Sequence, residues 1–380
     1  MKKYCLLLLT ALLLTGCWDA NVPQKMYYAH GMGIDYVDDH FEVYVQVVDF
    51  ANIAKSEQRQ PDAPQAEVGR GRGKTVDQAV VNLYHTLDMR LYWGHLSFIV
   101  FSKSAMEEGQ VNNVVNFLNS YRETRYEIWM YGTDEKVSDI MLATPVLNTA
   151  LNLSSLADPL NSYEQESYVA PVSFRQYILR LNEPDYTVKI PFVKMKENWK
   201  SQKEKDKRIE YAGIAVISEK ELKGVLQGEE VLGTKFMTEE MKRTLLTYKL
   251  KDTSLSVVIQ NVKVDVKAKP VGGSFTFDIT VKLNATPSEF STKITENELI
   301  ESAKKEVEKK IRETYEAALD QDIDIYRLSN HAYKQHVKEW KSVAEKGKIL
   351  LDEDSISSVE VFIEKLGAAR KGIIKESLTN

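Results

Sequence analysis

The spacing of apolar and polar positions predicts a sheet with covering helices in the first half of the chain. Residues 26–35 are apolar with interspersed glycines, and apolar and polar residues alternate over 41–47, which with Asp38 and Asp39 between them predicts a β-hairpin. Apolar residues every three or four positions after Thr75 predict a helix to Leu91, with Thr75 as its N-cap. Further strands are predicted at 95–101, 127–131 and 187–195, and further helices after Ser104, Asp134 and Ser173. This order predicts a mixed α/β layer.

The second half is richer in β-branched residues and alternation. Strands are predicted at 212–217, 222–226, 255–266, 275–283 and 358–363, and a second, shorter helix at 331–344. The longest helical pattern runs from Glu296 to Leu319, with one apolar stripe. That stripe is expected to face an internal core, and contact with a partner is the alternative. The predicted fold class is α+β, a mixed α/β N-terminal domain followed by a β-rich C-terminal domain whose antiparallel strands are packed by the long helix.

Two polar segments interrupt these elements. Residues 51–73 are rich in Gln, Pro, Arg and Gly and predict an exposed loop. Residues 196–208 are highly charged, with Trp199 as their one large apolar residue, and predict a domain linker or, alternatively, a long solvated hairpin loop. We therefore expect an N-terminal domain at 17–195 and a C-terminal domain at 209–370, the latter undivided or split again to give three domains in total.

The first residues have the pattern of a secretory leader. Lys2 and Lys3 precede an uncharged leucine-rich run that is about half the roughly 20 residues a membrane span needs. The run ends in Leu-Thr-Gly-Cys17, which resembles the bacterial lipobox. We expect a signal peptide at 1–16, cleavage before Cys17, and a diacylglyceryl group on its sulfur that supplies two-chain anchoring to a membrane. Because Cys5 leaves with the leader, no thiol is then available for a disulfide or a cysteine metal site.

Composition and motifs exclude several function classes. The charge balance of 50 Lys and Arg against 55 Asp and Glu is not that of a nucleic-acid-binding protein. The segment from Gly69 to Thr75 imitates a phosphate loop, but the first glycine of that motif would fall at Val68. The histidines lack zinc-site spacing, and no Gly-x-Ser-x-Gly elbow is present. We expect no enzyme activity, no cofactor and no metal.

Several motifs, in order along the chain, resemble the Ger(x)C family, the lipoprotein C subunits of spore germinant (nutrient) receptors. They are Cys17-Trp18-Asp19, Gly31-Met32-Gly33-Ile34-Asp35, Gly73-Lys74-Thr75, Trp93-Gly94-His95-Leu96, Gly213-Ile214-Ala215-Val216 with Leu222-Lys223-Gly224, Gln321-Asp322-Ile323-Asp324-Ile325, and Val359–Ile363 with Gly367. Lys74 replaces the usual Arg of its motif, and the glycine that often follows the motif at 321–325 is absent.

The resemblance implies a function in nutrient-triggered germination, through assembly or signal transmission with two polytopic subunits, A and B. It implies a lipid-anchored location on the outer face of the spore inner membrane, and no catalytic residues. Trp93, Gly94 and His95 are the candidates for partner contact. Their alternative interpretation is structural, with Trp93 in the core, Gly94 in a turn and His95 bonded to backbone. A solute-binding lipoprotein of a transporter is the alternative function. The successive strands with tight turns predicted in the second half disfavour it, because solute receptors of that kind usually have parallel sheets. A lipid-anchored envelope enzyme is a third possibility, for which no catalytic constellation is found.

Overall fold

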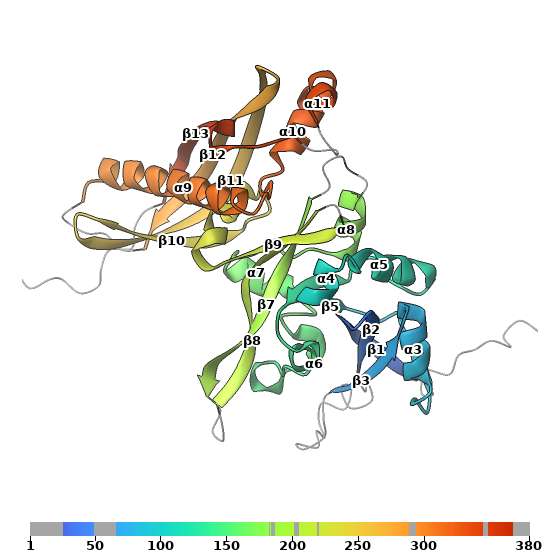
Figure 1. Ribbon diagram of the computed structural model, residues 1–380. Helices are drawn as coiled ribbons and strands as arrows, with labels where there is room; N and C mark the ends of the chain where they lie inside the picture. Colours follow the sequence, from blue (N-terminus) through green and yellow to red (C-terminus); the bar gives the residue numbers. More distant parts are fainter. Residues whose placement is uncertain are drawn as a thin grey trace, which may run out of the picture.

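The computed structural model describes residues 26–48, 66–181, 183, 187–200, 205–218, 220–288, 294–344 and 349–367. These residues form two sheets, one above the other in Figure 1. The first sheet has nine strands in the order β3-β2-β1-β5-β6-β7-β8-β9, with β4 also paired to β1. Its strands are β1 (Met26–Val37), β2 (His40–Val48), β3 (Ala66–Gly73), β4 (Arg90–Tyr92), β5 (Phe98–Ser102), β6 (Trp129–Thr133), β7 (Thr187–Lys200), β8 (Lys205–Ser218) and β9 (Glu221–Gln227).

The hairpin predicted around Asp38 and Asp39 is confirmed. Strands β1 and β2 pair antiparallel up to Val37 and His40, and both aspartates have positive φ, 51° and 57°. Such a two-residue turn matches the right-handed twist of the flanking strands. At the centre of the sheet, β1, β5, β6 and β7 run parallel to one another, and the outer pairs from β1 through β2 to β3 and from β7 through β8 to β9 are antiparallel. The result is the mixed sheet that the sequence predicts.

Helices cover both faces of this sheet. They are α3 (Val76–Tyr84), α4 (Lys103–Glu107), α5 (Val111–Ser120), α6 (Val137–Met141), α7 (Pro159–Gln165) and α8 (Phe174–Leu181). On β5, Ile99 and Phe101 belong to the core beneath α3, α4 and α5, whereas Phe98 and Val100 belong to the core beneath α6. The strand is therefore apolar throughout because both of its faces are buried.

The starts and ends of these helices differ in part from the predicted ones. Thr75 caps α3 as expected, accepting from the Gln78 amide, but the helix ends at Tyr84 because the chain turns into β4. Helix α4 is capped by Ser102 instead of Ser104, and α6 begins after Lys136 without a cap from Asp134. These short helices are fixed by packing on the sheet more than by their caps.

Strand β3 overturns part of the predicted loop at 51–73. Residues 66–73 pair with β2, and residues 51–65 lie outside the described part of the chain. Glycines 69, 71 and 73 of this strand face α3, and a Cβ on Gly71 would lie 2.0 Å from the carbonyl oxygen of Ala79. The glycines let the helix backbone approach the strand directly, which a larger residue prevents.

Charged residues that suggest a linker form the end of a hairpin instead. Lys196–Lys200 and 205–208 are the outer ends of β7 and β8, which pair from Thr187 with Ser218 to Lys200 with Lys205. Figure 1 shows this hairpin reaching away from the rest of the sheet. These residues are the paired strands of a hairpin, as in the second of the two interpretations. The first sheet continues through residue 227, past the expected start of the second domain at 209.

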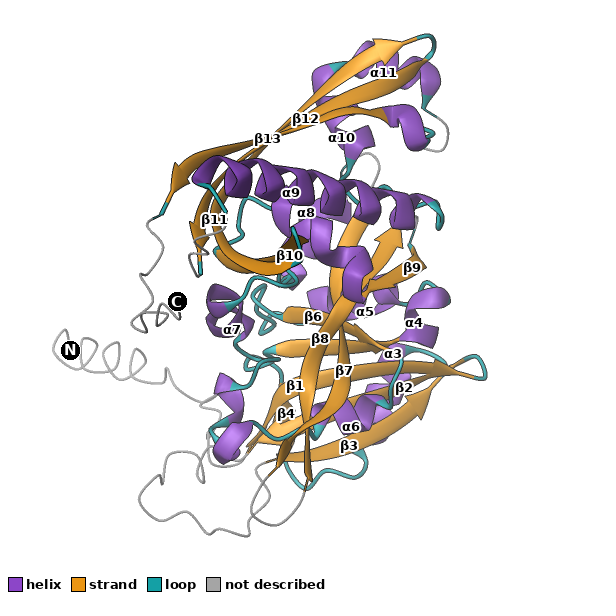
Figure 2. Cartoon of the chain, turned by 90° about the vertical axis from the view of Figure 1, so that its left-hand side faces the viewer, coloured by secondary structure: helices purple, strands orange, loops and turns teal. Residues whose placement is uncertain are grey.

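The second sheet has the order β10-β11-β12-β13 and carries the long helix α9 (Glu296–Leu319). Its strands are β10 (Arg243–Leu250), β11 (Thr253–Val271), β12 (Ser274–Pro287) and β13 (Ile356–Leu366). Strand β10 is not among the predicted strands, and β13 pairs with β12 in parallel, unlike the antiparallel pairs before it. Helix α9 has the predicted bounds and lies along the sheet (Figure 2). Its buried stripe includes Ile311 and Tyr315, so the stripe faces the internal core.

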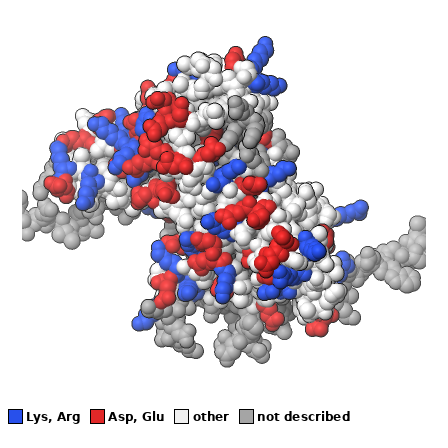
Figure 3. Space-filling model, viewed as in Figure 1, with Lys and Arg blue, Asp and Glu red and all other residues white. Residues whose placement is uncertain are grey.

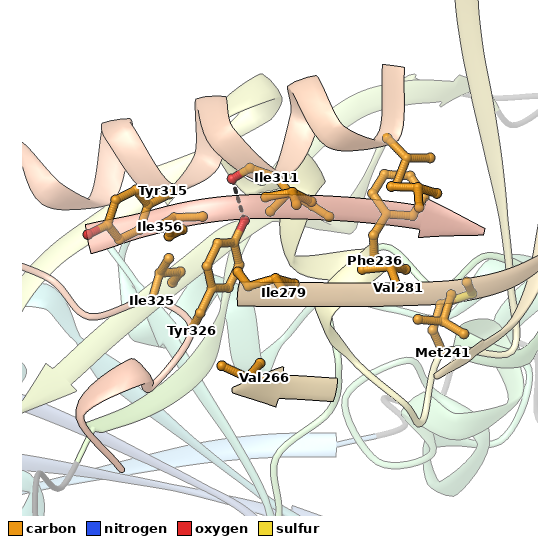
Figure 4. Close-up of a cluster of buried hydrophobic side chains, with 14 of the residues drawn as sticks. Phe236, Met241, Val266, Ile279, Val281, Ile311, Tyr315, Ile325, Tyr326 and Ile356 are labelled. Atoms are coloured by element: carbon orange, nitrogen blue, oxygen red, sulfur yellow. Dashed lines mark hydrogen bonds between the residues drawn. The ribbon is translucent and has the colours of Figure 1, made fainter. Parts of the chain in front are cut away.

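Two shorter helices, α10 (Leu328–Gln335) and α11 (Val337–Val343), replace the single one predicted at 331–344. Figure 4 shows the core between α9 and the sheet, where the Tyr326 hydroxyl donates to the Ile311 carbonyl oxygen at 2.8 Å. Ile214, Val216 and Leu226 of the first sheet belong to this same core. The two halves are joined by a common hydrophobic core, and the fold class is α+β, as expected.

Polar contacts reinforce the junction between the halves. The Lys189 ammonium of β7 donates to the Ile325 carbonyl oxygen at 3.2 Å, and Arg327 forms an ion pair with Glu183. Burial, assisted by the nearby Arg180 and Arg327 guanidinium groups, lowers the pKa of Lys189 to about 8. A Cβ on Gly224 would lie 2.0 Å from the side-chain oxygen of Gln321. The motif at 321–325 therefore lies where α9 ends against the β8–β9 hairpin.

Candidate partner-contact site

The Trp93-Gly94-His95 motif lies in the short connection between β4 and β5. Its backbone forms a turn in which the Leu96 amide donates to the Trp93 carbonyl oxygen at 3.1 Å. The Trp93 amide donates to a carboxylate oxygen of Glu123 at 3.1 Å. The motif is thus held from two sides, by the strand β4 and by the segment that follows α5.

Trp93 is a core residue, with 1% of its surface exposed. Its indole packs against the rings of Phe117 and Tyr121, at centroid distances of 6.0 Å and 6.1 Å. The indole N–H donates to the Tyr84 hydroxyl at 2.9 Å. A buried tryptophan needs such a partner because an unpaired N–H is costly away from water. Trp93 therefore fixes α3, β4 and α5 relative to one another.

Gly94 and His95 occupy different surroundings. Gly94 is buried, and a Cβ there would lie 2.5 Å from the Tyr92 hydroxyl oxygen. His95 is half-buried, with its ring edge-on to Tyr28 at 5.1 Å and near Tyr92 at 5.9 Å. Burial lowers the pKa of His95, and the Arg125 charge lowers it further. Of the three motif residues, His95 is the one whose side chain reaches the surface, within a group of aromatic rings.

A cavity of about 880 Å³ opens beside Trp93. Its lining comes from the end of α3, from β4 and from the end of α5, and consists of Tyr84, Leu87, Met89, Arg90, Leu91, Trp93, Ser120, Tyr121, Arg122 and Glu123. Burial raises the pKa of the Tyr121 hydroxyl, and the neighbouring Tyr84 adds to this effect. Tyr121 therefore stays a neutral hydrogen-bonding group at physiological pH. An aromatic wall with Arg and Glu at its margin suits recognition of another molecule.

A second polar group, around His30, lies deep under α6. The register of β1 shifts between Ala29 and Gly31, so His30 is at a bulge. Its Nδ1 lies 2.7 Å from Oε1 of Gln46, and the Gln46 amide N–H donates to the Met141 carbonyl oxygen. Because that donation leaves Gln46 Oε1 as an acceptor, Nδ1 must carry the proton. Protonation would place a charge on the buried Nε2, and burial accordingly lowers the pKa of His30.

Sequence reasoning did not single out the network around Lys235, which joins the halves on another side. Lys235 lies in the 3-10 helix η4 (Gly228–Met237) and is 8% exposed. Its ammonium contacts Glu166 at 3.0 Å and the Thr244 hydroxyl at 2.9 Å, and lies 5.0 Å from the centre of the Tyr168 ring. Glu166 is 69 residues away from Lys235 in the sequence, so no local signal could have revealed this pair.

Cys17, the predicted lipidation site, lies outside the residues that the structure describes. In the described part of the chain, no group of three or more His, Cys, Asp or Glu side chains is arranged to hold a metal ion. None of the helices described has an apolar stretch sufficient to cross a membrane. Acidic and basic side chains are interspersed over the face drawn in Figure 3.

Comparison with known proteins identifies the family. The model of the spore germination protein N-terminal domain matches residues 19–195, and the model described as spore germination B3/GerAC like, C-terminal, matches residues 212–362. The chain is 22% identical over 370 residues to spore germination protein KC of Bacillus subtilis (strain 168), covering 90% of each. It is 22% identical over 360 residues to spore germination protein B3 of the same organism, covering 90% of this chain and 91% of that protein.

A solved structure shares the fold. The crystal structure of the GerBC protein superposes with a TM-score of 0.52 at 17% identity, covering 89% of this chain and 96% of that one. The two domain models together span most of the sequence, in the order expected from the motifs. The chain therefore belongs to the Ger(x)C family of spore germination proteins.

Proposed function

We propose that this chain is the lipid-anchored C subunit of a spore germinant receptor. In this role it is needed for nutrient-triggered germination, through assembly or signal transmission with two polytopic subunits. The observation that carries the proposal is the match of both family domains across nearly the whole chain. The subunit acts by binding, without catalysis, and lies on the outer face of the spore inner membrane, where acylation of Cys17 holds it.

The cavity beside Trp93 is the proposed contact for a polytopic subunit. Trp93 is buried and hydrogen-bonded, so the wall it forms is rigid before a partner arrives. Binding to a preorganised surface loses less side-chain entropy than binding to a mobile one. Beside Trp93 in the chain, Tyr92 and His95 pack with Tyr28 as a half-buried aromatic group, and aromatic rings are common energetic anchors of interfaces. Trp93 and Gly94 contribute by holding the wall, and His95 by direct contact.

Co-purification tests this contact. The full chain is tagged and expressed with its polytopic subunits, and the amount of those subunits recovered from detergent extracts is measured. His95→Ala is expected to reduce recovery several-fold, because the half-buried aromatic group loses the imidazole ring that is proposed to touch the partner. His40→Ala, at the turn between β1 and β2 and at the opposite end of β1 from its pairing with β4, is the matched control and is expected to leave recovery unchanged. Equal recovery with both variants would argue against this contact. If the unaltered chain recovered no polytopic subunit, that result would argue against the proposed receptor function.

The size of the same cavity favours one alternative, a solute-binding lipoprotein. A volume of about 880 Å³ lies within the range of small-molecule sites. A ligand at a thousandfold excess over its Kd stabilises the folded state by about 4 kcal/mol. Thermal unfolding in the presence of amino acids, sugars and nucleosides measures this directly. The receptor-subunit proposal expects no shift with any of them, and a saturable shift would favour the alternative.

A further inference from the structure

We propose that an apolar patch beside the β7–β8 hairpin lies against the lipid bilayer. The inference rests on the proposed anchoring of Cys17 and adds to it a second, non-covalent membrane contact. The patch consists of the large apolar residues that are exposed in one segment and on the neighbouring hairpin, namely Leu142, Val146, Leu147, Leu153, Leu160 and Trp199. We refer to these six residues as the 142–160 patch.

The large apolar side chains of this patch are exposed and lie close together. Leu147 is 88% exposed, Leu153 is 61% exposed and Trp199 is 50% exposed. Isolated apolar residues on a surface need no explanation, but a group of them marks an interaction site. Leu147 also has φ of 56° and ψ of 25°, a left-handed conformation that a leucine rarely adopts. The backbone therefore holds this side chain outward at a cost in conformational energy.

The two parts of the patch form one surface. Val146, Leu153 and Trp199 line the same groove, which has a volume of about 540 Å³. Across this groove, the Arg208 guanidinium donates to the carbonyl and hydroxyl oxygens of Thr144, both at 3.0 Å. Arg208 thereby ties the segment after α6 to the end of the hairpin, and Figure 1 shows α6 and the hairpin at the same end of the molecule.

The hairpin supplies the charges that suit a membrane surface. Lys196 and Lys200 are on the same strand as Trp199, and Lys207 and Arg208 are on the facing strand. Over residues 196–210, six Lys and Arg stand against four Asp and Glu, a net charge of +2, and Glu210 pairs with Lys196. A tryptophan on a hairpin with an excess of lysine and arginine fits the interface of an anionic bilayer, with the ring at headgroup depth and the cations near lipid phosphates.

The length of the proposed tether allows this contact. Nine positions separate Cys17 from Met26, where the fold begins, and an extended chain of that length spans roughly 30 Å. From Met26 the first strand needs five further positions, about 17 Å, to reach Gly31. Gly31 pairs with Phe98, whose side chain lines the groove of the patch. A bilayer that holds the acylated Cys17 is therefore within reach of the patch.

Vesicle binding by a chain that lacks the lipid tests the proposal. The full chain carries Cys17→Ser, so acylation contributes nothing, and it is sedimented with vesicles of equal parts phosphatidylglycerol and phosphatidylcholine. We expect binding, and we expect Leu147→Ser combined with Leu153→Ser to weaken it about tenfold or more, since two exposed leucines leave the apolar phase. Trp199→Ala is expected to act in the same direction. Leu350→Ser combined with Val271→Ser, 69% and 55% exposed elsewhere, is the control and is expected to leave binding unchanged.

Two results would overturn the inference. One is equal vesicle binding, or none, for the patch variant and the control, with both shown by circular dichroism to be folded. The other is a chain that does not bind vesicles but co-purifies with the polytopic subunits, where the patch variant loses this co-purification. That result would assign the patch to a protein partner. Because the Cys17→Ser chain is tested without its receptor, failure here leaves the proposed receptor function untouched. Failure of co-purification likewise leaves vesicle binding to be judged separately.

Discussion

Replacing Trp93 with alanine tests whether the motif at 93–95 depends on a core anchor. The indole is 1% exposed and packs against two aromatic rings. Truncating a buried tryptophan costs about 3–5 kcal/mol in transfer and cavity terms. The Tyr84 hydroxyl also loses the indole N–H donor, which adds about 1 kcal/mol. The expected loss in the free energy of unfolding is therefore about 4–6 kcal/mol.

Scanning calorimetry of the purified chain measures this loss. For a cooperative unit of about 150–250 residues, such as the N-terminal domain, each kcal/mol lowers the melting temperature by about 2–4 °C, so Trp93→Ala should lower it by about 8–24 °C. Trp93→Phe keeps most of the apolar volume and should cost about 1–2 kcal/mol, chiefly through the missing N–H. Trp199→Ala, at a position that is 50% exposed, is the control and should stay within about 0.5 kcal/mol. If Trp93→Ala matched that control, the anchoring role derived for Trp93 would be refuted.

Three further predictions concern other parts of the fold. Gly71→Ala would place a Cβ 2.0 Å from the Ala79 carbonyl oxygen, and should cost about 3 kcal/mol in thermal unfolding, because backbone on both sides must shift. Burial lowers the pKa of His30, so this residue binds fewer protons in the folded state than in the unfolded state. Its contribution to the free energy of unfolding is therefore fully present above pH 6.5 and is lost as the pH falls below that value. His30→Asn, which keeps a donor for Gln46, should flatten the pH dependence of the urea midpoint between about pH 7 and pH 5. Lys235→Met should lower the free energy of unfolding by about 2 kcal/mol, because Glu166 and Thr244 lose the buried ammonium donor. Urea unfolding measures this change. An unchanged midpoint would contradict this role of Lys235.

Local signals in the sequence predict much of this fold. The ends of α9 are predicted correctly because the capping box of Thr295 and Glu298 and the apolar stripe over 24 residues are both local. The pair Gly272-Gly273 is another local signal, typical of a hairpin turn, and it forms the turn between β11 and β12, where both residues have positive φ, 57° and 84°. Strand β10 also carries a local signal, because Thr244, Leu246 and Tyr248 alternate as buried positions, although it is not among the predicted strands.

Other features depend on contacts that are distant in sequence. The glycine-rich sequence of β3 is typical of a loop. Its glycines are needed because α3 packs closely against the strand, and this contact cannot be seen in the local sequence. The parallel pairing of β13 with β12 requires the crossover through α9 and the shorter helices, which no local pattern specifies. At the candidate site, the motif at 93–95 is visible in the sequence. Its surroundings are not, because Phe117, Tyr121 and Glu123 approach from the next helix and the segment after it.

Germination of spores that lack this chain is the most direct test of its proposed receptor function. The gene for this chain is deleted in its host, and the fall in optical density of purified spores is followed after each nutrient is added. The account predicts that at least one nutrient response is lost, that the unaltered chain restores it, and that a Cys17→Ala chain restores it poorly because the tether is missing. Spores without the chain that respond to every nutrient like unaltered spores would contradict the account.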